Sequence, residues 1–445
     1  MVKFVISSSV YQAQISDLLP SNDNCKAQLI YSLLNSYDVF KYFDKVIKVP
    51  YASRKDLARF HSKQYLDVAL DPRFNKDTEE SEDWEYLPQL VNRYYEVHED
   101  VSKGDVWYES KSDLYKKYIS YINAADYDDF GEDFNDGESF EPDSLVRFGL
   151  VDDCFPMDYL PMYIHTIAGS TLSLVRELSI KGEPTIAINW DGGRHHAFKS
   201  RASGFCYIND IVLLIQELRK NGYSRVSYVD FDLHHGDAVE SAFQYSRNVQ
   251  TCSLHLFEAG FFPGTGSFKN CRETNVVNIP LFHGLDDESL DEIVDNILIP
   301  CVNKHDPEVL VIQCGADGLS GDKYKEWQLT IHGLTRNILK LVDIHSYKKV
   351  VLLGGGGYNP TLQSRFYTYV TVCLLKYHKG IPSLISDSED EHIIEHHLID
   401  FYRKEAYKFW YYEYEGLGSK KLINYNNKET LRELKVLFGS TDVLS

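Results

Sequence analysis

The chain has 445 residues, a formal net charge of -20 and a pI near 5.2. Because nucleic-acid phosphates would be repelled by such a surface, this balance argues against direct nucleic-acid binding and suits basic partners. No apolar run reaches the length of a membrane span, and the N-terminus lacks a signal-peptide pattern. Eight cysteines without a CxxC pair predict reduced thiols in an intracellular protein.

Four apolar segments are predicted to be parallel strands, and each runs into a polar or glycine-rich tip: residues 185–190, 226–229, 309–313 and 350–353. Residues 211–220, followed by Gly222, predict a helix that crosses between two of them. Parallel α/β sheets bind ligands outside the carboxyl ends of their strands, so we expect the tips to converge. The sequence thus predicts one α/β domain over 1–445, with a central, mostly parallel sheet flanked by helices.

The tip that follows the second strand, DFDLHHGD at 230–237, packs three carboxylates and two imidazoles into eight positions. Such a cluster at the mouth of an apolar strand is costly unless a cation is bound. On a continuing strand, Asp230, Asp232 and His234 would share one face, and this donor set suits zinc. A three-ligand catalytic site needs one more donor beside Asp232 and His234, and Asp317 at the third tip is available. The alternative is a solvated loop rich in Asp and His.

The other tips supply candidate chemistry for such a metal site. The tandem pair His195 and His196 is structural in the simplest interpretation, but Asp230 and Asp237 are spare carboxylates able to orient two imidazoles beside a metal. Tyr358 follows four glycines, so its phenol is either a donor to a developing oxyanion or a packed aromatic after a flexible turn. The run GGGGYN lacks the Lys-Ser/Thr of a phosphate-binding loop.

Five segments in this order carry a family resemblance: NWDGGRHHAFKSRASGFCYIND (189–210), YVDFDLHHGD (228–237), GFFPGTG (260–266), CGAD (314–317) and GGGGYN (354–359). Together they resemble the class I zinc-dependent histone deacetylases, most closely the fungal Hos-type branch, over roughly residues 3–70 and 148–380. The resemblance implies an arginase/deacetylase-like fold and zinc-dependent hydrolysis of acetyl-lysine in proteins. It implies a histone tail or a cohesin SMC subunit as substrate, and a corepressor or chromatin complex as partner.

The resemblance also implies a role for individual residues. The zinc ligands are matched by Asp232, His234 and Asp317, and the carbonyl-polarising tyrosine by Tyr358. Two histidine–aspartate pairs are matched by His195 with Asp230 and by His196 with Asp237, and His196 is expected to transfer the protons. Substrate contacts are matched by Asp153 at the rim, Gly204 through its backbone, and Phe205 and Phe262 as tunnel walls.

Family members also bind potassium. One site would use the backbone carbonyls of four residues and one hydroxyl: Asp230, Asp232, His234 and Leu254, with Ser253. A second would use the carbonyls around Phe243, Ser246 and Val249.

Two positions depart from the family pattern. Arg194 stands where an apolar or aromatic residue is common, and we expect it to change the electrostatics of the tunnel rim. Ala238 stands where a glycine usually follows HHGD, and we expect ordinary backbone angles there. Cys154 and Cys206 both flank site motifs, which raises the hypothesis of a regulatory disulfide.

Two regions lie outside the motifs. The acidic insertion at about 72–147 is longer than the family loop; we expect a solvated segment with a helix within 83–121, or an arm for a basic partner. The C-terminal extension at about 381–445 is expected to be partly helical and to pack on the catalytic domain. His392, His396 and His397 in it are expected on a solvated helix, without a specific role.

Two other functions stay open. One is a related amidohydrolase that acts on acetylated polyamines or, with two manganese ions, a ureohydrolase; the histidine pair and Tyr358 favour a single zinc. The other is a scaffold that binds acetyl-lysine without catalysis.

Overall fold

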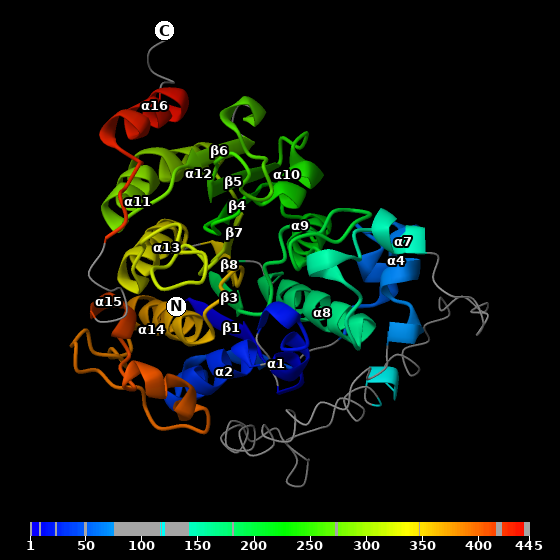
Figure 1. The fold of residues 1–445 in the computed structure, drawn as a ribbon, viewed down its shortest axis with the longest axis horizontal. Helices are drawn as coiled ribbons and strands as arrows, with labels where there is room; N and C mark the ends of the chain where they lie inside the picture. The colour runs from blue at the N-terminus through cyan, green and yellow to red at the C-terminus, as the bar shows by residue number, and fades with distance from the viewer. Residues whose placement is uncertain are drawn as a thin grey trace.

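Eight strands form one sheet in the order β2-β1-β3-β8-β7-β4-β5-β6, and every pairing between neighbours is parallel (Figure 1). This is a computed structural model, and it describes residues 2–8, 10–22, 25–48, 51–74, 116, 118–120, 142–179, 182–271, 275–346, 348–414 and 421–439. The strands are β1 Lys3–Ser7, β2 Lys45–Ile47, β3 Thr185–Asn189, β4 Val226–Asp230, β5 Val249–Leu256, β6 Val276–Leu281, β7 Val309–Gln313 and β8 Lys349–Leu353.

The four predicted strands are confirmed, and they are adjacent at the centre of the sheet as β3, β8, β7 and β4. Their last residues are also in register. Asn189 pairs with Leu353, Leu353 with Gln313, and Gln313 with Asp230. The loops that follow therefore leave the sheet at one level, which brings together residues that are far apart in the chain.

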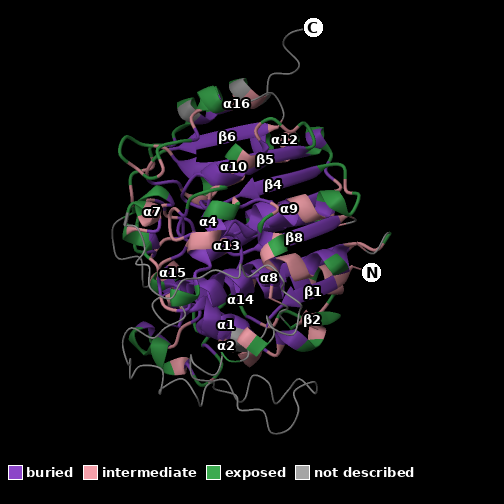
Figure 2. Ribbon diagram, turned by 90° about the vertical axis from the view of Figure 1, so that its right-hand side faces the viewer, coloured by how far each residue is buried: buried purple, intermediate pink, exposed green. Residues whose placement is uncertain are grey.

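Helices cover both faces of the sheet, as the α/β prediction requires, and the strands between them are buried almost throughout (Figure 2). One face packs on α8 (Leu160–Leu178) and α9 (Asp210–Lys220) through residues such as Ala187, Val311 and Val351. The other face packs through Ile188, Ile312 and their neighbours on a second set of helices: α2 (Lys26–Ser36), α11 (Asp287–Ile293), α13 (Ile331–His345) and α14 (Pro360–Lys379). The remaining helices are α1 Val10–Ser16, α3 Arg54–Leu57, α4 Lys63–Ala69, α7 Pro142–Arg147, α10 Asp237–Phe243, α12 Ile299–His305, α15 Tyr411–Tyr414 and α16 Lys428–Gly439.

Helix α9 confirms the predicted crossover helix. The Asn209 side chain accepts a hydrogen bond from the Val212 backbone N–H at 3.0 Å, which caps the first turn. Gly222 follows the last turn with a φ of +98°, a conformation that suits glycine. No helix in the described part of the chain is both long and apolar enough to cross a membrane.

The C-terminal extension packs on the sheet domain. Its Phe409 and Trp410 are fully buried in the same apolar cluster as the face that carries Ile188. Arg365 of α14 is also fully buried, and its guanidinium forms an ion pair with Glu405 at 2.5 Å. These contacts attach residues 385–414 to the domain.

Two predictions concern the C-terminal extension and the acidic insertion. The helix expected around His392, His396 and His397 is wrong, because these residues lie in non-helical chain; among the described residues, no candidate metal cluster includes them. The acidic insertion and the helix expected within 83–121 fall mostly outside the described residues.

Burial of Glu413 predicts a pH-dependent stability. Burial raises the pKa of Glu413 to about 7, although the Ile331 backbone N–H donates to its Oε1. The folded state binds this proton more tightly than the unfolded state does. The stabilisation of the fold by protonated Glu413 is therefore fully present at low pH and is lost as pH rises through about 7. Glu413→Gln should therefore be more stable than wild type at pH 8, by about 3 kcal/mol, and not at pH 4. Urea unfolding of both proteins across this range measures the difference, and parallel curves would contradict the prediction.

Candidate active site

The DFDLHHGD segment is where the structure first corrects the sequence interpretation. Strand β4 ends at Asp230, so Asp232 and His234 lie in the following loop and not on a shared strand face. Asp230 contacts His195 and His234 contacts Asp317, which follows β7, while Asp232 lies near both pairs. Strand alternation therefore did not predict which residues these side chains contact, although Asp230, Asp232 and His234 still lie in the same buried region.

Asp232, His234 and Asp317 form a compact buried cluster. One donor atom from each lies within 4.8 Å of the others, and the residues are 1%, 4% and 1% exposed. His234 Nδ1 is 3.2 Å from Asp232 Oδ1 and 2.9 Å from Asp317 Oδ2. Gln313 Nε2 and the Gly356 backbone N–H each donate to Asp232 Oδ2 at 2.7 Å. A side chain at Gly356 would lie 2.3 Å from Asp317 Oδ2, so the glycine-rich tip is what lets the backbone approach.

The charge of this cluster fits a divalent cation. Two carboxylates are buried next to each other, and the groups that hydrogen-bond to them are mostly neutral. Burial lowers the pKa of His234, but the hydrogen bonds and charges of Asp232 and Asp317 outweigh it and raise this pKa to about 10. The site thus attracts positive charge strongly, and two oxygen donors with one imidazole nitrogen suit zinc.

Two histidine–aspartate pairs flank the cluster. His195 Nδ1 is 2.9 Å from Asp230 Oδ2, and His196 Nδ1 is 2.9 Å from Asp237 Oδ1. The imidazole centroids are 3.9 Å apart. Burial opposes protonation of both rings, but Asp230 and Asp232 raise the pKa of His195 to about 9, while burial and the neighbouring His195 lower that of His196 to about 4. One imidazole therefore tends to be charged and the other neutral.

The loop that carries the histidine pair is held by α9. Asp210, in the first turn of this helix, accepts from the backbone N–H groups of Gly193 at 3.0 Å and Arg194 at 2.8 Å. Asn209 donates to the Ala197 carbonyl at 2.9 Å. The crossover helix thus positions the histidine pair.

Aromatic rings enclose the cluster. Phe262 lies 4.9 Å from His196 and 6.1 Å from His234, measured between ring centroids. Tyr324 lies 5.0 Å from both His234 and Tyr358, and Tyr358 lies 5.9 Å from Phe205. Phe262 and Tyr324 are each 40% exposed, so both rings are partly accessible to solvent. Burial and the charges of Asp317 and Asp232 raise the pKa of Tyr358 well above its usual value, so its phenol keeps its proton.

The remaining predicted substrate residues, Gly204 and Asp153, lie near these rings and each other. Gly204 lies against His196 and Phe262, since a side chain there would contact both rings. Asp153 is exposed, and partial burial raises its pKa, although hydrogen bonds, among them one from the Gly204 backbone, oppose this rise. The structure thus places Asp153, the predicted rim carboxylate, next to Gly204, the predicted substrate-binding glycine.

Several site residues were missed by sequence reasoning. Tyr228 donates to Asp230 Oδ2 at 2.6 Å, and it stands two positions before Asp230, where strand alternation could have found it. Gln313, the polar end of an apolar strand, was a similar signal. Asp322 accepts from the Tyr358 backbone N–H at 2.7 Å and from that of Tyr324 at 3.3 Å, which ties two aromatic walls together. No sequence pattern indicated Tyr324.

The two departures from the family pattern behave differently. Arg194 is not at the rim as expected: it is only 8% exposed, and its Nη2 donates to the Asp191 carbonyl at 3.1 Å. Ala238 lies in helix α10, so ordinary backbone angles are confirmed there.

Cys154 and Cys206 are buried free thiols, and burial raises the pKa of Cys206 to about 12, which disfavours the thiolate that oxidation requires.

The predicted potassium ligands lie on neighbouring elements. Asp230 of β4 and Ser253 of β5 are directly paired in the sheet, and Leu254 follows on the same strand. Phe243 ends α10, its carbonyl accepts from the Ser246 backbone N–H at 2.7 Å, and Val249 begins β5.

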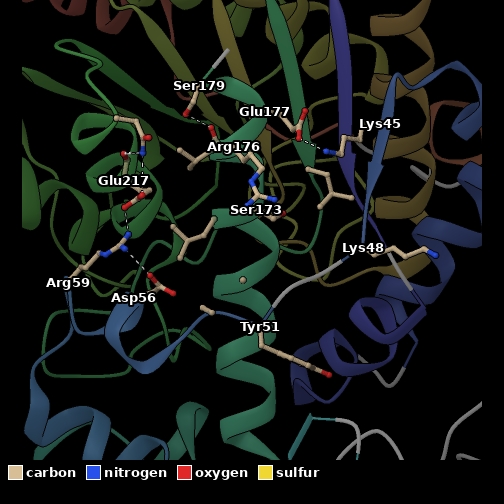
Figure 3. Close-up of a pocket in the computed structure, with 16 residues that line it drawn as sticks. Lys45, Lys48, Tyr51, Asp56, Arg59, Ser173, Arg176, Glu177, Ser179 and Glu217 are labelled. Atoms are coloured by element: carbon tan, nitrogen blue, oxygen red, sulfur yellow. Dashed lines mark hydrogen bonds and ion pairs between the residues drawn. The ribbon is translucent and has the colours of Figure 1, made fainter. Parts of the chain in front are cut away.

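A cavity of about 820 Å³ lies away from this cluster, beside α8 and β2 (Figure 3). Five of its charged side chains form ion pairs with one another: Lys45 with Glu177, and Arg59 with Glu217 and Asp56. None of the predicted site residues lines it. The chemistry therefore resides at the strand tips and not in this cavity.

Comparison with known proteins assigns the family. Residues 21–374 match the histone deacetylase domain. The chain is 44% identical over 461 residues to Histone deacetylase HOS1 of Saccharomyces cerevisiae, covering 96% of this chain and 97% of that protein. The chain belongs to the histone deacetylase family. It is also 39% identical over 258 residues to Histone deacetylase 8 of Xenopus laevis, covering 57% of this chain and 77% of that one.

Family membership makes this protein a lysine deacetylase, a hydrolase that acts on acetyl-lysine. The predicted family and fold are confirmed. In the described part of the chain, two overlapping groups that share Asp232 could hold a metal ion in this hydrolase: Asp232, His234 and Asp317, and His195, Asp230 and Asp232.

The metal site is testable by counting bound metal. Asp232→Asn removes one of the two cluster charges, and since even outer partners of metal ligands are worth about 10- to 100-fold in affinity, we expect at least a 100-fold loss. Metal analysis of dialysed protein should show near-stoichiometric metal in wild type and almost none in the variant. Asp191→Asn, which alters a buried carboxylate outside the cluster, is the matched control. Equal metal in Asp232→Asn and wild type would exclude this cluster.

Proposed function

We propose that this chain is a zinc-dependent protein lysine deacetylase in which Asp232, His234 and Asp317 hold one zinc ion. When bound, zinc would polarise the acetyl carbonyl and lower the pKa of water so that attack is feasible at neutral pH. The observation that carries the proposal is the convergence of this cluster, two hydrogen-bonded histidine–aspartate pairs and one phenol on a single aromatic-walled opening.

The aromatic walls would bind the substrate side chain. The neutral stem of acetyl-lysine is largely apolar, so Phe205 and Phe262 can cover it, and Tyr324 supplies a further wall. At the opening, Asp153 and the Gly204 backbone would hold the substrate main chain. A bound stem excludes bulk water from the reacting carbonyl, which strengthens the electrostatic interactions there.

His196 would transfer the protons. Because its Nδ1 is engaged by Asp237, the free Nε2 can accept a proton from the attacking water. The water oxygen bonds to the carbonyl carbon, and the Tyr358 phenol donates to the oxyanion that develops. His196 then returns a proton to the leaving nitrogen as the C–N bond breaks, giving acetate and lysine. His195, held by Asp230, would tune the charge next to it.

The substrate would be an acetylated segment of a basic protein. A formal charge of -20 attracts basic segments electrostatically. We propose a histone tail or the SMC subunit of cohesin, encountered in the nucleus, the cytoplasm or both, with a corepressor or chromatin complex as partner. Reduced thiols at all eight cysteines are compatible with these compartments.

Two potassium ions would reinforce the site. The first would be bound by the carbonyls of four residues and one hydroxyl: Asp230, Asp232, His234 and Leu254, with Ser253. The second would be bound by the carbonyls around Phe243, Ser246 and Val249. Pairing of β4 with β5 supports the first, because it places the Asp230 and Ser253 backbones side by side.

Acetate release from acetylated histone and cohesin peptides tests the function. We expect wild-type activity to be lost on zinc chelation and restored by zinc, and His196→Ala to retain metal while kcat falls by about 100-fold or more. His392→Ala removes an exposed imidazole and should behave as wild type. Near-normal turnover by His196→Ala would refute its role, and faster hydrolysis of acetylated polyamines would favour that alternative substrate.

A further inference from the structure

The loop Phe261–Gly266 contacts both imidazoles on which the chemistry depends. Phe261 stacks on His234, with ring centroids 5.1 Å apart and planes 10° apart. Phe262 meets His196 edge to face, at 4.9 Å and 78°. Phe262 is 40% exposed, so packing of its side chain alone covers the ring incompletely. The loop backbone therefore needs an anchor of its own.

Two other histidines provide this anchor. His235 Nδ1 shares a hydrogen bond with the Thr265 hydroxyl at 2.8 Å, and His255 Nε2 donates to the Gly266 carbonyl at 2.9 Å. Gly266 has a φ of +89°, and a Cβ there would lie 2.3 Å from His255 Nε2. The end of the loop thus rests directly on the two imidazoles, whose centroids are 4.5 Å apart.

The anchoring imidazoles are themselves fixed by the sheet and by α10. His235 Nε2 is 3.0 Å from Glu240 Oε2, and the same oxygen accepts from Asn278 of β6 at 2.7 Å. His255 Nδ1 is 3.0 Å from the Ser253 hydroxyl of β5. Because a carbonyl only accepts, His255 carries its hydrogen on Nε2, and Ser253 donates to Nδ1. Both rings are almost fully buried, at 1% and 0% exposure.

We infer that His235 and His255 are positioning residues that hold the Phe261–Gly266 loop, and so keep the Phe262 wall in register with His196. The inference rests on the proposed function, because it takes Phe262 as a wall of the acetyl-lysine site. It assigns a structural role to His235, the second histidine of the HHGD motif, which is not part of the metal cluster. The anchor acts through the loop, and it touches neither metal nor substrate.

Thr265 offers the cleanest test, because it is exposed and its hydroxyl contacts His235 directly. Thr265→Val keeps the shape and removes the hydroxyl, whereas Thr265→Ser keeps the hydroxyl. With a histone acetyl-lysine peptide, we expect Thr265→Val to lower kcat/KM about tenfold, mainly through KM, because small misplacements of positioning groups are costly. Thr265→Ser should match wild type, and all variants should share one metal content and melting temperature.

A double-mutant cycle separates positioning from general damage. In the Phe262→Ala background, Thr265→Val should cost less than twofold, since no ring remains to be positioned. Glu240→Ala loosens the same anchor from its far end and should reproduce the KM effect. Equal kcat/KM for Thr265→Val and Thr265→Ser would overturn the inference. So would a loss of kcat/KM on Thr265→Val that is as large in the Phe262→Ala background as in wild type. Inactive wild type would instead overturn the proposed function.

Discussion

Buried negative charge at one edge of a parallel sheet is the constraint on which the structure of this protein depends. Asp230, Asp232 and Asp317 are each no more than 1% exposed, at the ends of two adjacent central strands. Carboxylates in such a place are costly unless hydrogen bonds and a cation compensate them. Neutral donors such as Gln313 and the Gly356 backbone orient Asp232 without cancelling its charge. The remaining charge is what selects a metal ion.

The same edge of the sheet carries two histidine–aspartate pairs, for which we propose different roles. Asp230 accepts from Tyr228 and from the Asp232 backbone N–H in addition to its contact with His195, so its orientation is fully determined. Asp237 lies in the first turn of α10, next to His196. Each imidazole therefore has one nitrogen held by a carboxylate. Such preorganisation would let the proposed proton transfer proceed without rearrangement of the protein.

The aromatic rings lie close to the buried carboxylates, whereas the net charge of the chain acts on a substrate at longer range. The aromatic rings of Phe205, Phe262 and Tyr324 lie around the site, and in the proposed function they would cover a neutral, apolar stem. Farther out, the acidic character of the whole chain favours basic segments over nucleic acid. The walls depend in turn on polar anchors: Asp322 behind Tyr358 and Tyr324, and the buried imidazoles behind the Phe262 loop. Local recognition is thus built on a hydrogen-bonded layer beneath the rings.

The sequence by itself determined the central strands, the crossover helix at 211–220 and the convergence of the tips, because apolar runs and turn residues report local periodicity. It also placed Asp317 with Asp232 and His234, since parallel strands must present their carboxyl ends at a common edge. Only the tertiary structure decided that β4 stops at Asp230, that Arg194 is buried and that Tyr324 becomes a wall. These features depend on which side chains meet after loops of different length have folded together. Such distances are set by long-range packing, which a local pattern along the chain does not encode.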